Sequence, residues 1–578
     1  MRWTYWIFAC ALAMGCAPRT KKYVPNRDGG APDSGVVDPP KCTDDPQDVD
    51  LNGKLFLCPP EAECIEGQCV PACDAAAQQK GATGCDFWAP DPPFYNNGFG
   101  GGFDGACYAV FLANARGTPA QITVTRNGQT YNVSDFGRIP KGVGPKATYE
   151  PIPAQGLPPN EVAVLFLSHK PGVKNGASSL ECPVKPAILQ DAAVSGGGRG
   201  KAFHITVDSP VNAYDILPYG GADSYLPSAS LLFPATAWGT NYFGLGPHLQ
   251  GGGTVWLLVV GSTNSTTVKV APPVQLKGGS GLLSAPAGVT STFNLDAGEI
   301  LQWMGDGTGA ILQSDQPVAV FTGNTYLGVS TSTSGPGGED SAHQQLQHIK
   351  ALGSEYVGPG VASRMASMAP ESVLYRIQGV VDGTTITWDP PAGDRPQTLK
   401  AGQVVEFETK QIFTVRSQDE DHPFQLTHYF SGAVSQGRPG CSSKYGSSCN
   451  LGDEEWVILL PPQQFARHYV FFVDPSYATT NLVVTRKKGS SGFSDVKLEC
   501  LGTISGWKAV GGGDYEVAYV DLVVGEKPVA QCGTSRHEAT SEGLFGIMVW
   551  GTDWYSSYGY PAGGNSHNIN QVDVPPPS

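Results

Sequence analysis

The residue with the clearest chemistry is Cys16, a thiol at the end of a short apolar segment. Arg2 supplies a positive charge, and an apolar run without acidic residues leads into Leu12-Ala-Met-Gly-Cys16. This layout is typical of a secretory signal and is too short to span a membrane. In a signal of the lipoprotein type, the Cys16 thiol receives a diacylglyceryl group and the chain is cleaved after Gly15. We therefore expect a lipid anchor at Cys16; an ordinary secretory signal with a chance cysteine is the alternative.

The remaining cysteines predict disulfide chemistry. Of 14 cysteines, Cys10 lies in the predicted signal and Cys16 is the lipidation site, which leaves an even set of 12. In an exported chain this indicates up to six disulfides and no free thiol. The sequence does not define their pairing. The alternative is a zinc site between Cys64 and Cys73, but that segment has no Cys-x-x-Cys pair and no nearby histidine. The candidates are Cys42, Cys58, Cys64, Cys69, Cys73, Cys85, Cys107, Cys182, Cys441, Cys449, Cys500 and Cys532.

Motifs for catalysis are missing from the sequence. There is no Gly-x-Ser-x-Gly nucleophile elbow and no P-loop, and His537-Glu538 lacks the second histidine of a zinc-protease helix. The acidic run Asp419-Glu-Asp421 lies in turn-like sequence, whereas a glycosidase needs two carboxyl groups on facing strands. We therefore expect no catalytic residue, no metal and no cofactor.

Two Gly-rich and Ser-rich loops carry aromatic residues and are candidate ligand-binding loops. They span residues 94–103 and 550–560. Aromatic rings on adaptable loops suit stacking on sugars or contact with proteins, and ordinary packing between domains is the alternative. The candidate contact residues are Phe94, Tyr95, Phe99, Phe103, Trp550, Trp554 and Tyr555.

Composition indicates a folded chain of several domains. The length of 578 residues fits roughly three to five domains, and 40% hydrophobic residues are enough for packed cores. Only 15% of the residues are charged, while 74 Gly and 47 Pro indicate many turns. The net charge of -15 and the lack of a Lys/Arg cluster argue against a nucleic-acid partner.

From residue 86 onward the sequence predicts short strands that must position any binding loop. Val, Ile, Thr and aromatic stretches, such as 109–113, 162–167 and 255–260, alternate with Gly, Pro, Asn and Asp turns. Residues 344–352 have the pattern of one short helix.

Four short elements recur, the later copies at spacings of roughly 100 to 120 residues, which predicts a repeated unit. A Thr-rich strand occurs at 266–270 and 384–388, with weaker copies at 121–125 and 481–485. A Leu-x-Ala-Gly corner follows at 295–299 and 399–403. A Pro corner between two strands occurs at 208–211, 315–318, 422–424 and 526–529, and an aromatic lead-in occurs at 232–242, 352–356 and 459–469. Units of this length fit an immunoglobulin-like sandwich, and a β-propeller, whose blades are usually shorter, is the alternative.

We predict an all-β fold of tandem β-sandwich (immunoglobulin-like) repeats after a small disulfide-rich module. A lipoprotein signal peptide (1–15) precedes a lipid-anchored, disordered tether (16–41) and the cysteine-rich module (42–85). The β repeats are expected at 86–220, 221–330, 331–432 and 433–565, followed by a disordered tail at 566–578.

Several short motifs carry a resemblance to a known family. Gly84-Cys-Asp-Phe-Trp-Ala-Pro90, the strand ending at Tyr108-Ala-Val-Phe111, Ala229-Ser-Leu-Leu-Phe-Pro234 and Ser314-Asp-Gln-Pro-Val-Ala-Val320 follow in the expected order. The chain resembles bacterial, largely myxobacterial, lipoproteins that carry an IgGFc-binding protein N-terminal domain, over residues 85 to about 560. The resemblance implies an extracellular binding role and no catalytic motif. No Fc-contacting residue maps onto this sequence, so the ligand stays open.

Together these features predict a lipoprotein of the bacterial cell envelope, held by lipid to the outer membrane and exposed at the surface. Its expected partners are the membrane, through the anchor, and an extracellular protein or glycan. The alternatives are a secreted carbohydrate-active enzyme and a structural envelope protein without a specific ligand.

Overall fold

The structure is a computed structural model that describes most of the chain. The described residues are 41–42, 48–51, 54–59, 61–96, 103–142, 147–248, 250–335, 337–446 and 449–577. The predicted signal peptide, Cys16, residues 17–40 of the predicted tether, and Phe99 lie outside them. The described chain is all-β, with antiparallel sheets and an N-terminal disulfide-rich region.

The body consists of four β-sandwich repeats, and the third shows the plan most simply. It has two four-stranded sheets, one in the order β25-β30-β27-β28 and the other in the order β29-β26-β31-β34. The core between them is lined by alternate residues of each strand. In β27, for example, Ile386 and Trp388 are buried while Thr385 and Thr387 face solvent. The strands are β25 (Glu355–Gly358), β26 (Val373–Gly379), β27 (Thr384–Asp389), β28 (Thr398–Leu399), β29 (Val404–Thr409), β30 (Phe413–Ser417), β31 (Phe424–Phe430) and β34 (Glu455–Ile458).

The second repeat has the same plan, but one long strand serves both sheets. The first half of β23 pairs with β18 and β20, and its second half pairs with β19 and β24. Pro317 lies at this change of partners, and Pro423 lies between β30 and β31 in the third repeat. Proline suits this point because it has no N–H to donate to a ladder. The strands are β18 (Gly239–Phe243), β19 (Val255–Gly261), β20 (Thr266–Ala271), β21 (Ser291–Leu295), β22 (Glu299–Met304), β23 (Ile311–Leu327) and β24 (Asp340–Gln345), and β15 (Gly198–Lys201) adds an edge strand.

The first and fourth repeats also contain one long strand that joins two sheets. In the first repeat it is β16 (Phe203–Leu217), with β6 (Thr83–Ala89), β7 (Tyr108–Ala113), β8 (Ile122–Arg126), β9 (Gln129–Tyr131), β10 (Gly137–Lys141), β11 (Thr148–Pro151), β12 (Val162–Ser168) and β17 (Ser228–Leu232). In the fourth it is β42 (Arg536–Asp553), with β35 (Ala466–Phe472), β36 (Thr479–Lys487), β37 (Val496–Leu498), β38 (Gly502–Thr503), β39 (Lys508–Val510), β40 (Tyr515–Val524), β41 (Lys527–Pro528) and β43 (Ser556–Pro561). Short outliers are α2 (Val133–Phe136), β13 (Lys174–Asn175) and β14 (Ser178–Ser179).

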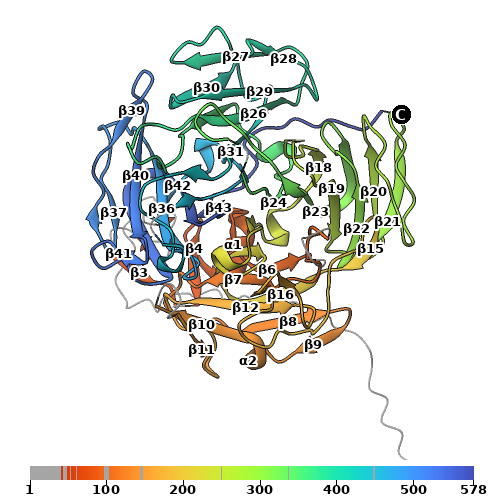
Figure 1. Ribbon diagram of the computed structural model, residues 1–578, viewed down its shortest axis with the longest axis horizontal. Helices are drawn as coiled ribbons and strands as arrows, with labels where there is room; N and C mark the ends of the chain where they lie inside the picture. Colours follow the sequence, from red (N-terminus) through yellow and green to blue (C-terminus); the bar gives the residue numbers. More distant parts are fainter. Residues whose placement is uncertain are drawn as a thin grey trace, which may run out of the picture.

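The last strand of each repeat lies at the centre of the body. These inner strands are β17, β24, β34 and β43, and each contacts the next, with β43 also contacting β17 (Figure 1). Side chains connect them: Ser228 donates to Glu455, and Gln344 donates to the backbone of Ala229. The units are two-layered sandwiches rather than the single-sheet blades of a closed propeller.

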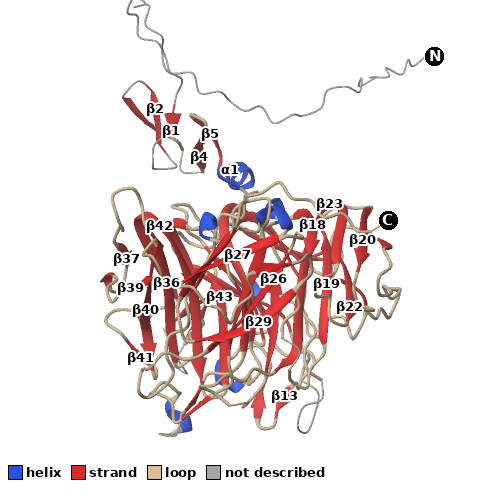
Figure 2. Ribbon diagram, turned by 90° about the horizontal axis from the view of Figure 1, so that it is seen from above, coloured by secondary structure: helices blue, strands red, loops and turns tan. Residues whose placement is uncertain are grey.

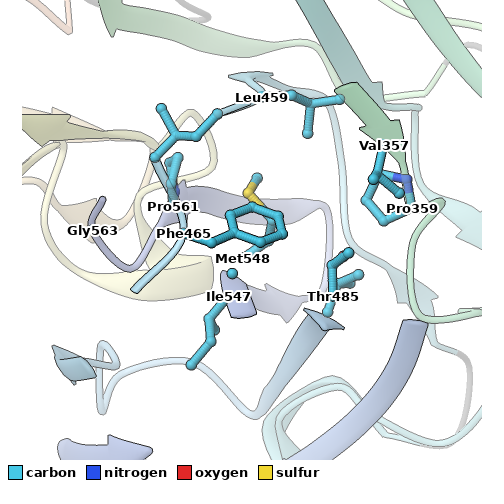
Figure 3. A pocket seen from close by; sticks show the side chains of 12 residues that line it. Val357, Pro359, Leu459, Phe465, Thr485, Ile547, Met548, Pro561 and Gly563 are labelled. Atoms are coloured by element: carbon cyan, nitrogen blue, oxygen red, sulfur yellow. The ribbon is translucent and has the colours of Figure 1, made fainter. Parts of the chain in front are cut away.

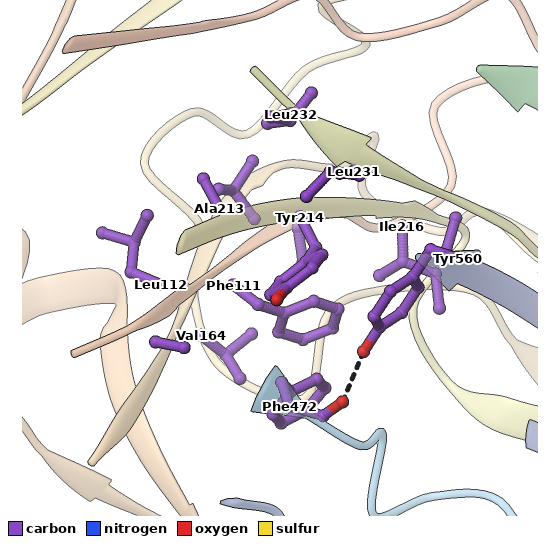
Figure 4. Packing of buried hydrophobic residues seen from close by; sticks show 14 of the residues in the cluster. Phe111, Leu112, Val164, Ala213, Tyr214, Ile216, Leu231, Leu232, Phe472 and Tyr560 are labelled. Carbon is purple, nitrogen blue, oxygen red and sulfur yellow. Dashed lines mark hydrogen bonds between the residues drawn. The ribbon is translucent and has the colours of Figure 1, made fainter. Parts of the chain in front are cut away.

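The first and last repeats share one hydrophobic core. Phe111 of β7 stacks on Phe472 of β35 with ring centres 3.9 Å apart. Tyr560 of β43 donates to the Phe472 carbonyl at 2.5 Å, and its ring lies 4.6 Å from that of Tyr214 (Figure 4). Residues more than 300 positions apart in the chain are therefore packed together, and this contact fixes the four repeats as one body.

Disulfides cross-link the chain in both its N-terminal and its C-terminal parts. Five pairs join Cys58 to Cys69, Cys73 to Cys85, Cys107 to Cys182, Cys441 to Cys449, and Cys500 to Cys532. Cys64 is disulfide-bonded as well, and the side chain of Cys42 lies outside the described part. The disulfide-rich region contains β1 (Lys41–Cys42), β2 (Asp48–Leu51), β3 (Lys54–Leu57), β4 (Ala62–Ile65), β5 (Gln68–Pro71) and α1 (Ala72–Gln79).

The disulfide-rich region lies over one end of the body, which we call the module end (Figure 2). Short 3₁₀ turns precede the first strands of the later repeats there: η3 (Ala235–Ala237), η4 (Ile349–Ala351) and η6 (Pro462–Gln464). α1 contacts η3, and Ala82 beside α1 bonds to the C-terminal segment at Gly564.

Three expectations about local structure are wrong. Residues 344–352 form the end of β24 and η4 rather than a helix. The strand at 481–485 belongs to β36, which occupies the place of β19 and not that of the Thr-rich strands. The Pro corner at 526–529 does lie between two strands, β40 and β41.

The expected disordered tail is the third correction. The described residues 566–577 lie along the module end in extended form, because neighbouring repeats offer them hydrogen bonds. Asn570 is 4% exposed and donates to the carbonyls of Ile349 and Leu352, and Val574 and Asn241 exchange two bonds.

Candidate functional site

The loops that lead into the four inner strands meet at the end of the body opposite the module end. Their described residues are 218–227, then 328–335 with 337–339, then 431–446 with 449–454, and 554–555, and we call the surface these residues form the loop face. Backbone hydrogen bonds join them: Gly432 donates to Val329, Gly452 donates to Asp553, and Tyr555 donates to Asn450. Because every repeat enters its inner strand at the same end, the fold itself brings these four distant segments together.

Aromatic side chains from three of these loops form one cluster. Trp554 stacks on Tyr445 with ring centres 4.6 Å apart. Its edge-on neighbours are Tyr225 at 5.9 Å and Tyr555 at 4.9 Å. All four rings are half-buried, so part of each stays open to solvent. Half-exposed Tyr and Trp are typical of binding surfaces.

The long third loop holds this cluster in place. It contains η5 (Ser443–Tyr445), the short strands β32 (Val434–Ser435) and β33 (Asn450–Leu451), and the disulfide between Cys441 and Cys449. Ser442 donates to the buried carboxylate of Asp553 through both its hydroxyl and its amide. Lys444 and the Tyr445 hydroxyl both bond Asp223 of the first loop, at 2.5 and 3.2 Å. Burial beside Asp223 raises the pKa of Tyr445 above its usual value.

Behind the third loop, a buried guanidinium fixes the backbone. Arg364 is 1% exposed and pairs with Glu371 at 2.7 Å. It also donates to the Ser431 carbonyl and lies 3.9 Å from the centre of the Phe430 ring. The start of the loop is therefore rigidly attached to the sandwich core of the third repeat.

A cavity of about 540 Å³ opens beside the aromatic cluster. Its wall combines the second loop, residues 365–367, the third loop and Tyr555. This volume lies in the range of about 300–1,000 Å³ that is usual for small-ligand sites. The lining residues are Thr333, Ser334, Gly335, Gly337, Met365, Ala366, Ser367, Ala433, Val434, Ser435, Gln436, Asn450 and Tyr555.

Each of the four loops contains one non-glycine residue with positive φ. These residues are Tyr225 at 62°, Glu339 at 92°, Gln436 at 53° and Tyr555 at 45°. Such backbone conformations cost free energy and tend to occur at functional sites, where surrounding contacts enforce them. Two of the four, Gln436 and Tyr555, line the cavity.

Buried carboxylates lie behind the cavity wall. Glu454 accepts the amides of Val329 and Glu339, whereas no hydrogen-bond donor in normal geometry reaches the carboxylate oxygens of Asp453 or Asp340 among the described residues. Burial, together with the neighbouring Glu454, raises the pKa of Asp453 and of Asp340 well above the usual range. A side-chain carbon at Gly338, where φ is 106°, would overlap the Asp453 carboxylate, so only glycine fits against it.

The structure separates the aromatic residues that the sequence singled out. Trp554 and Tyr555 lie on the loop face. Trp550 is fully buried and stacks on Phe430, so its prediction as a ligand contact is wrong: strand β42 turns it into the core.

The other aromatic loop packs against the body. Phe103 is buried at 4% exposure, which corrects its prediction as a ligand contact, whereas Phe94, at 9% exposure, lines a separate hollow of about 490 Å³. Tyr95 is half-buried and stacks on Tyr326 at 4.2 Å. Tyr225, Tyr445 and the cavity-lining polar residues were not predicted. Their only signal is position, since each precedes an inner strand that the sequence pattern does not reveal.

One further pocket and one side-chain cluster fit a ligand less well. An apolar pocket between the third and fourth repeats, lined by Phe465, Met548 and others, has a volume of about 30 Å³, room for about one water molecule (Figure 3). Within the described chain, the one group with the spacing of metal ligands is Glu499, Cys500 and His537. Cys500 is bonded to Cys532, so its sulfur is no thiolate ligand.

A family model described as IgGFc binding protein matches residues 228–551, more than half of the chain. The chain belongs to this family. The match to the IgGFc-binding protein family begins at β17 and ends within β42, so it includes the second and third loops of the loop face and the cavity wall they form. Family membership indicates an extracellular binding role. No curated protein matches this chain.

One structural finding concerns how this member of the IgGFc-binding protein family relates to a membrane. Among the described helices, none has the length and apolar character required to cross a bilayer.

Proposed function

We propose that this protein is a lipoprotein of the bacterial cell envelope that presents its loop face for binding or adhesion. Lipid on Cys16 would hold it in the outer membrane, facing outward. Its ligand is an extracellular protein or glycan, and its function requires no catalysis, metal or cofactor.

One observation carries this proposal. The disulfide-rich region and the loop face lie at opposite ends of the body (Figure 2). An anchor that precedes the disulfide-rich region in the chain leaves the loop face as the end directed away from the membrane. Binding residues are commonly found on loops that a rigid scaffold positions, and the four repeats are such a scaffold.

Two further features support the proposal. The disulfides suit an oxidising compartment, because cytosolic thiols are kept reduced. The buried carboxylates behind the loop face are covered by Gly338 and Glu339, so they do not form the open pair that glycoside hydrolysis needs.

The test has two steps. Cys16→Ser should move the protein from the membrane fraction to the soluble exported fraction, and persistence in the membrane would contradict the anchor. The released variant is then applied to arrays of glycans and extracellular proteins. Saturable binding supports the proposal; turnover of a glycan without retention would favour an enzyme, and silence on all arrays would favour a structural role.

A further inference from the structure

Among the described residues, no charged side chain lines the cavity of the loop face. Its polar groups are the hydroxyls of Thr333, Ser334, Ser367 and Ser435, and the amides of Gln436 and Asn450. Hydroxyl and amide groups can both donate and accept hydrogen bonds. The side chains of Ser367, Ser435 and Gln436 are exposed, so they are free to meet a ligand.

The groups behind the wall restrict the charge of the ligand. Asp453 lies against Gly338, and Glu454 accepts the amide of Glu339 and comes near the backbone of Gly335 at Gly432. The carboxylate of Glu454 opposes an anionic ligand. A cationic ligand finds no carboxylate in the cavity wall, and burying a charge without a partner is costly. The wall therefore fits a ligand that is polar and uncharged.

Tyr555 adds a flat apolar surface to this polar wall. Its ring packs edge-on against Trp554, and its backbone is held by the bond from its amide to Asn450. A ring fixed in this way offers contact area at a low entropic cost. Polar hydrogen-bonding groups beside a rigid aromatic ring match the two kinds of surface that a sugar ring presents, its hydroxyls and its C–H face.

We propose that this cavity is a binding site for a short, uncharged oligosaccharide. The ligand's hydroxyls bond the Ser, Thr, Asn and Gln side chains, and one sugar ring rests against Tyr555. This inference rests on the proposed binding function and specifies the ligand class for the loop face.

The experiment uses the full chain with Cys16→Ser, which removes only the lipid. Short neutral gluco-, manno- and galacto-oligosaccharides are compared with sialylated and sulfated glycans and with extracellular proteins, first on arrays and then by calorimetry. Ser367→Trp places a bulky side chain in the cavity at an exposed position. The matched control is Ser490→Trp, another exposed serine, in the turn after β36 and outside the loop face.

Saturable binding of a neutral glycan is expected, and Ser367→Trp should weaken it by about tenfold or more while Ser490→Trp leaves it unchanged. Tyr555→Ala should weaken it similarly, with Tyr131→Ala, a half-buried tyrosine of β9, as control. Melting temperatures of all variants verify that they are folded.

Three results would overturn the inference. Preference for acidic glycans contradicts the charge argument, and binding that survives Ser367→Trp contradicts the location. Binding of a protein but of no glycan rejects the oligosaccharide and leaves the proposed display function intact. Silence on every array rejects both.

Discussion

The two ends of the four-repeat body are built on opposite principles. At the module end the three later repeats share one hydrogen bond. Near the start of each repeat, a tyrosine hydroxyl accepts a hydrogen bond from the backbone amide three residues earlier. Tyr242, Tyr356 and Tyr469 accept the amides of Gly239, Gly353 and Ala466, at 3.0, 3.0 and 2.9 Å. All three tyrosines are buried.

At the loop face no such device recurs. The loops at 218–227, 328–339, 431–454 and 554–555 differ in length, and one is closed by a disulfide. They leave rings half-exposed, backbone in costly conformations and carboxylates without donors. The difference indicates that the module end stabilises each later repeat from within, while the loop face gives up stability for recognition.

The same substitution at the two ends should have the largest difference in effect. Tyr469→Ala leaves a cavity in the core and removes the bonds to Ala466 and to the Phe545 carbonyl, so it should lower the free energy of unfolding by about 3–5 kcal/mol. Tyr555→Ala removes a half-buried ring and should cost about 1 kcal/mol or less. Chemical denaturation of both variants measures the difference.

Binding provides the reverse readout. Tyr555→Ala should weaken ligand binding, while any Tyr469→Ala protein that remains folded should bind normally. Equal losses of stability at the two sites would show that both ends support the fold alike.

The next largest effect concerns the carboxylates behind the loop face. Asp453→Asn replaces a buried carboxyl without a donor by a neutral amide of similar shape, and should raise the free energy of unfolding at neutral pH by about 1–3 kcal/mol. Thermal unfolding measures the change. Glu455→Gln is the matched control. Because Glu455 accepts hydrogen bonds from Ser228 and Ala229, this substitution should lower the free energy of unfolding of the protein.

The pH dependence follows from the same burial. The folded-state pKa values of Asp453 and Asp340 are raised above those of the unfolded chain, so their stabilising contribution is complete below the unfolded value. It is lost as the pH rises through the folded values. Asp474, whose pKa burial raises to about 6, loses its contribution between about pH 4 and 6. Asp453→Asn should flatten the fall in stability toward neutral pH; an unchanged slope would show that Asp453 holds its proton equally in the folded and unfolded chain.

Much of the architecture could be predicted because it depends on short-range chemistry. The Leu-x-Ala-Gly corners are turns where Gly298 and Gly402 adopt a φ of 73°, and β20 and β27 alternate as their Thr-rich patterns indicate. Pro317 and Pro423 marked the change between sheets. In the fourth repeat β42 makes this change without proline, and the Pro corner at 526–529 lies between β40 and β41 instead.

The site could be predicted only in part, because its members are joined by the packing of the inner strands. β24 is rich in buried polar residues, such as His343 bonded to Asp215 at 2.9 Å, and therefore lacks the apolar alternation of a strand. Tyr225 and Tyr445 lie 220 positions apart (445 − 225) and both pack against Trp554. Trp550 lies four residues before Trp554 but points into the core. The sequence alone does not show which of the two tryptophans is buried.

The smallest effect is expected for the charge pair that joins the first and third loops. Lys444 and Asp223 are 42% and 52% exposed, so solvent screens their contact. A double-mutant cycle with Lys444→Ala and Asp223→Ala should give a coupling of about 0–1 kcal/mol that falls with salt. A larger coupling energy that does not change with salt would contradict the contrast between the two ends, because the Lys444–Asp223 ion pair would then stabilise the loop face. A small coupling leaves the Tyr445–Trp554 stack and the bonds from Ser442 to Asp553 as the contacts that hold the loops together.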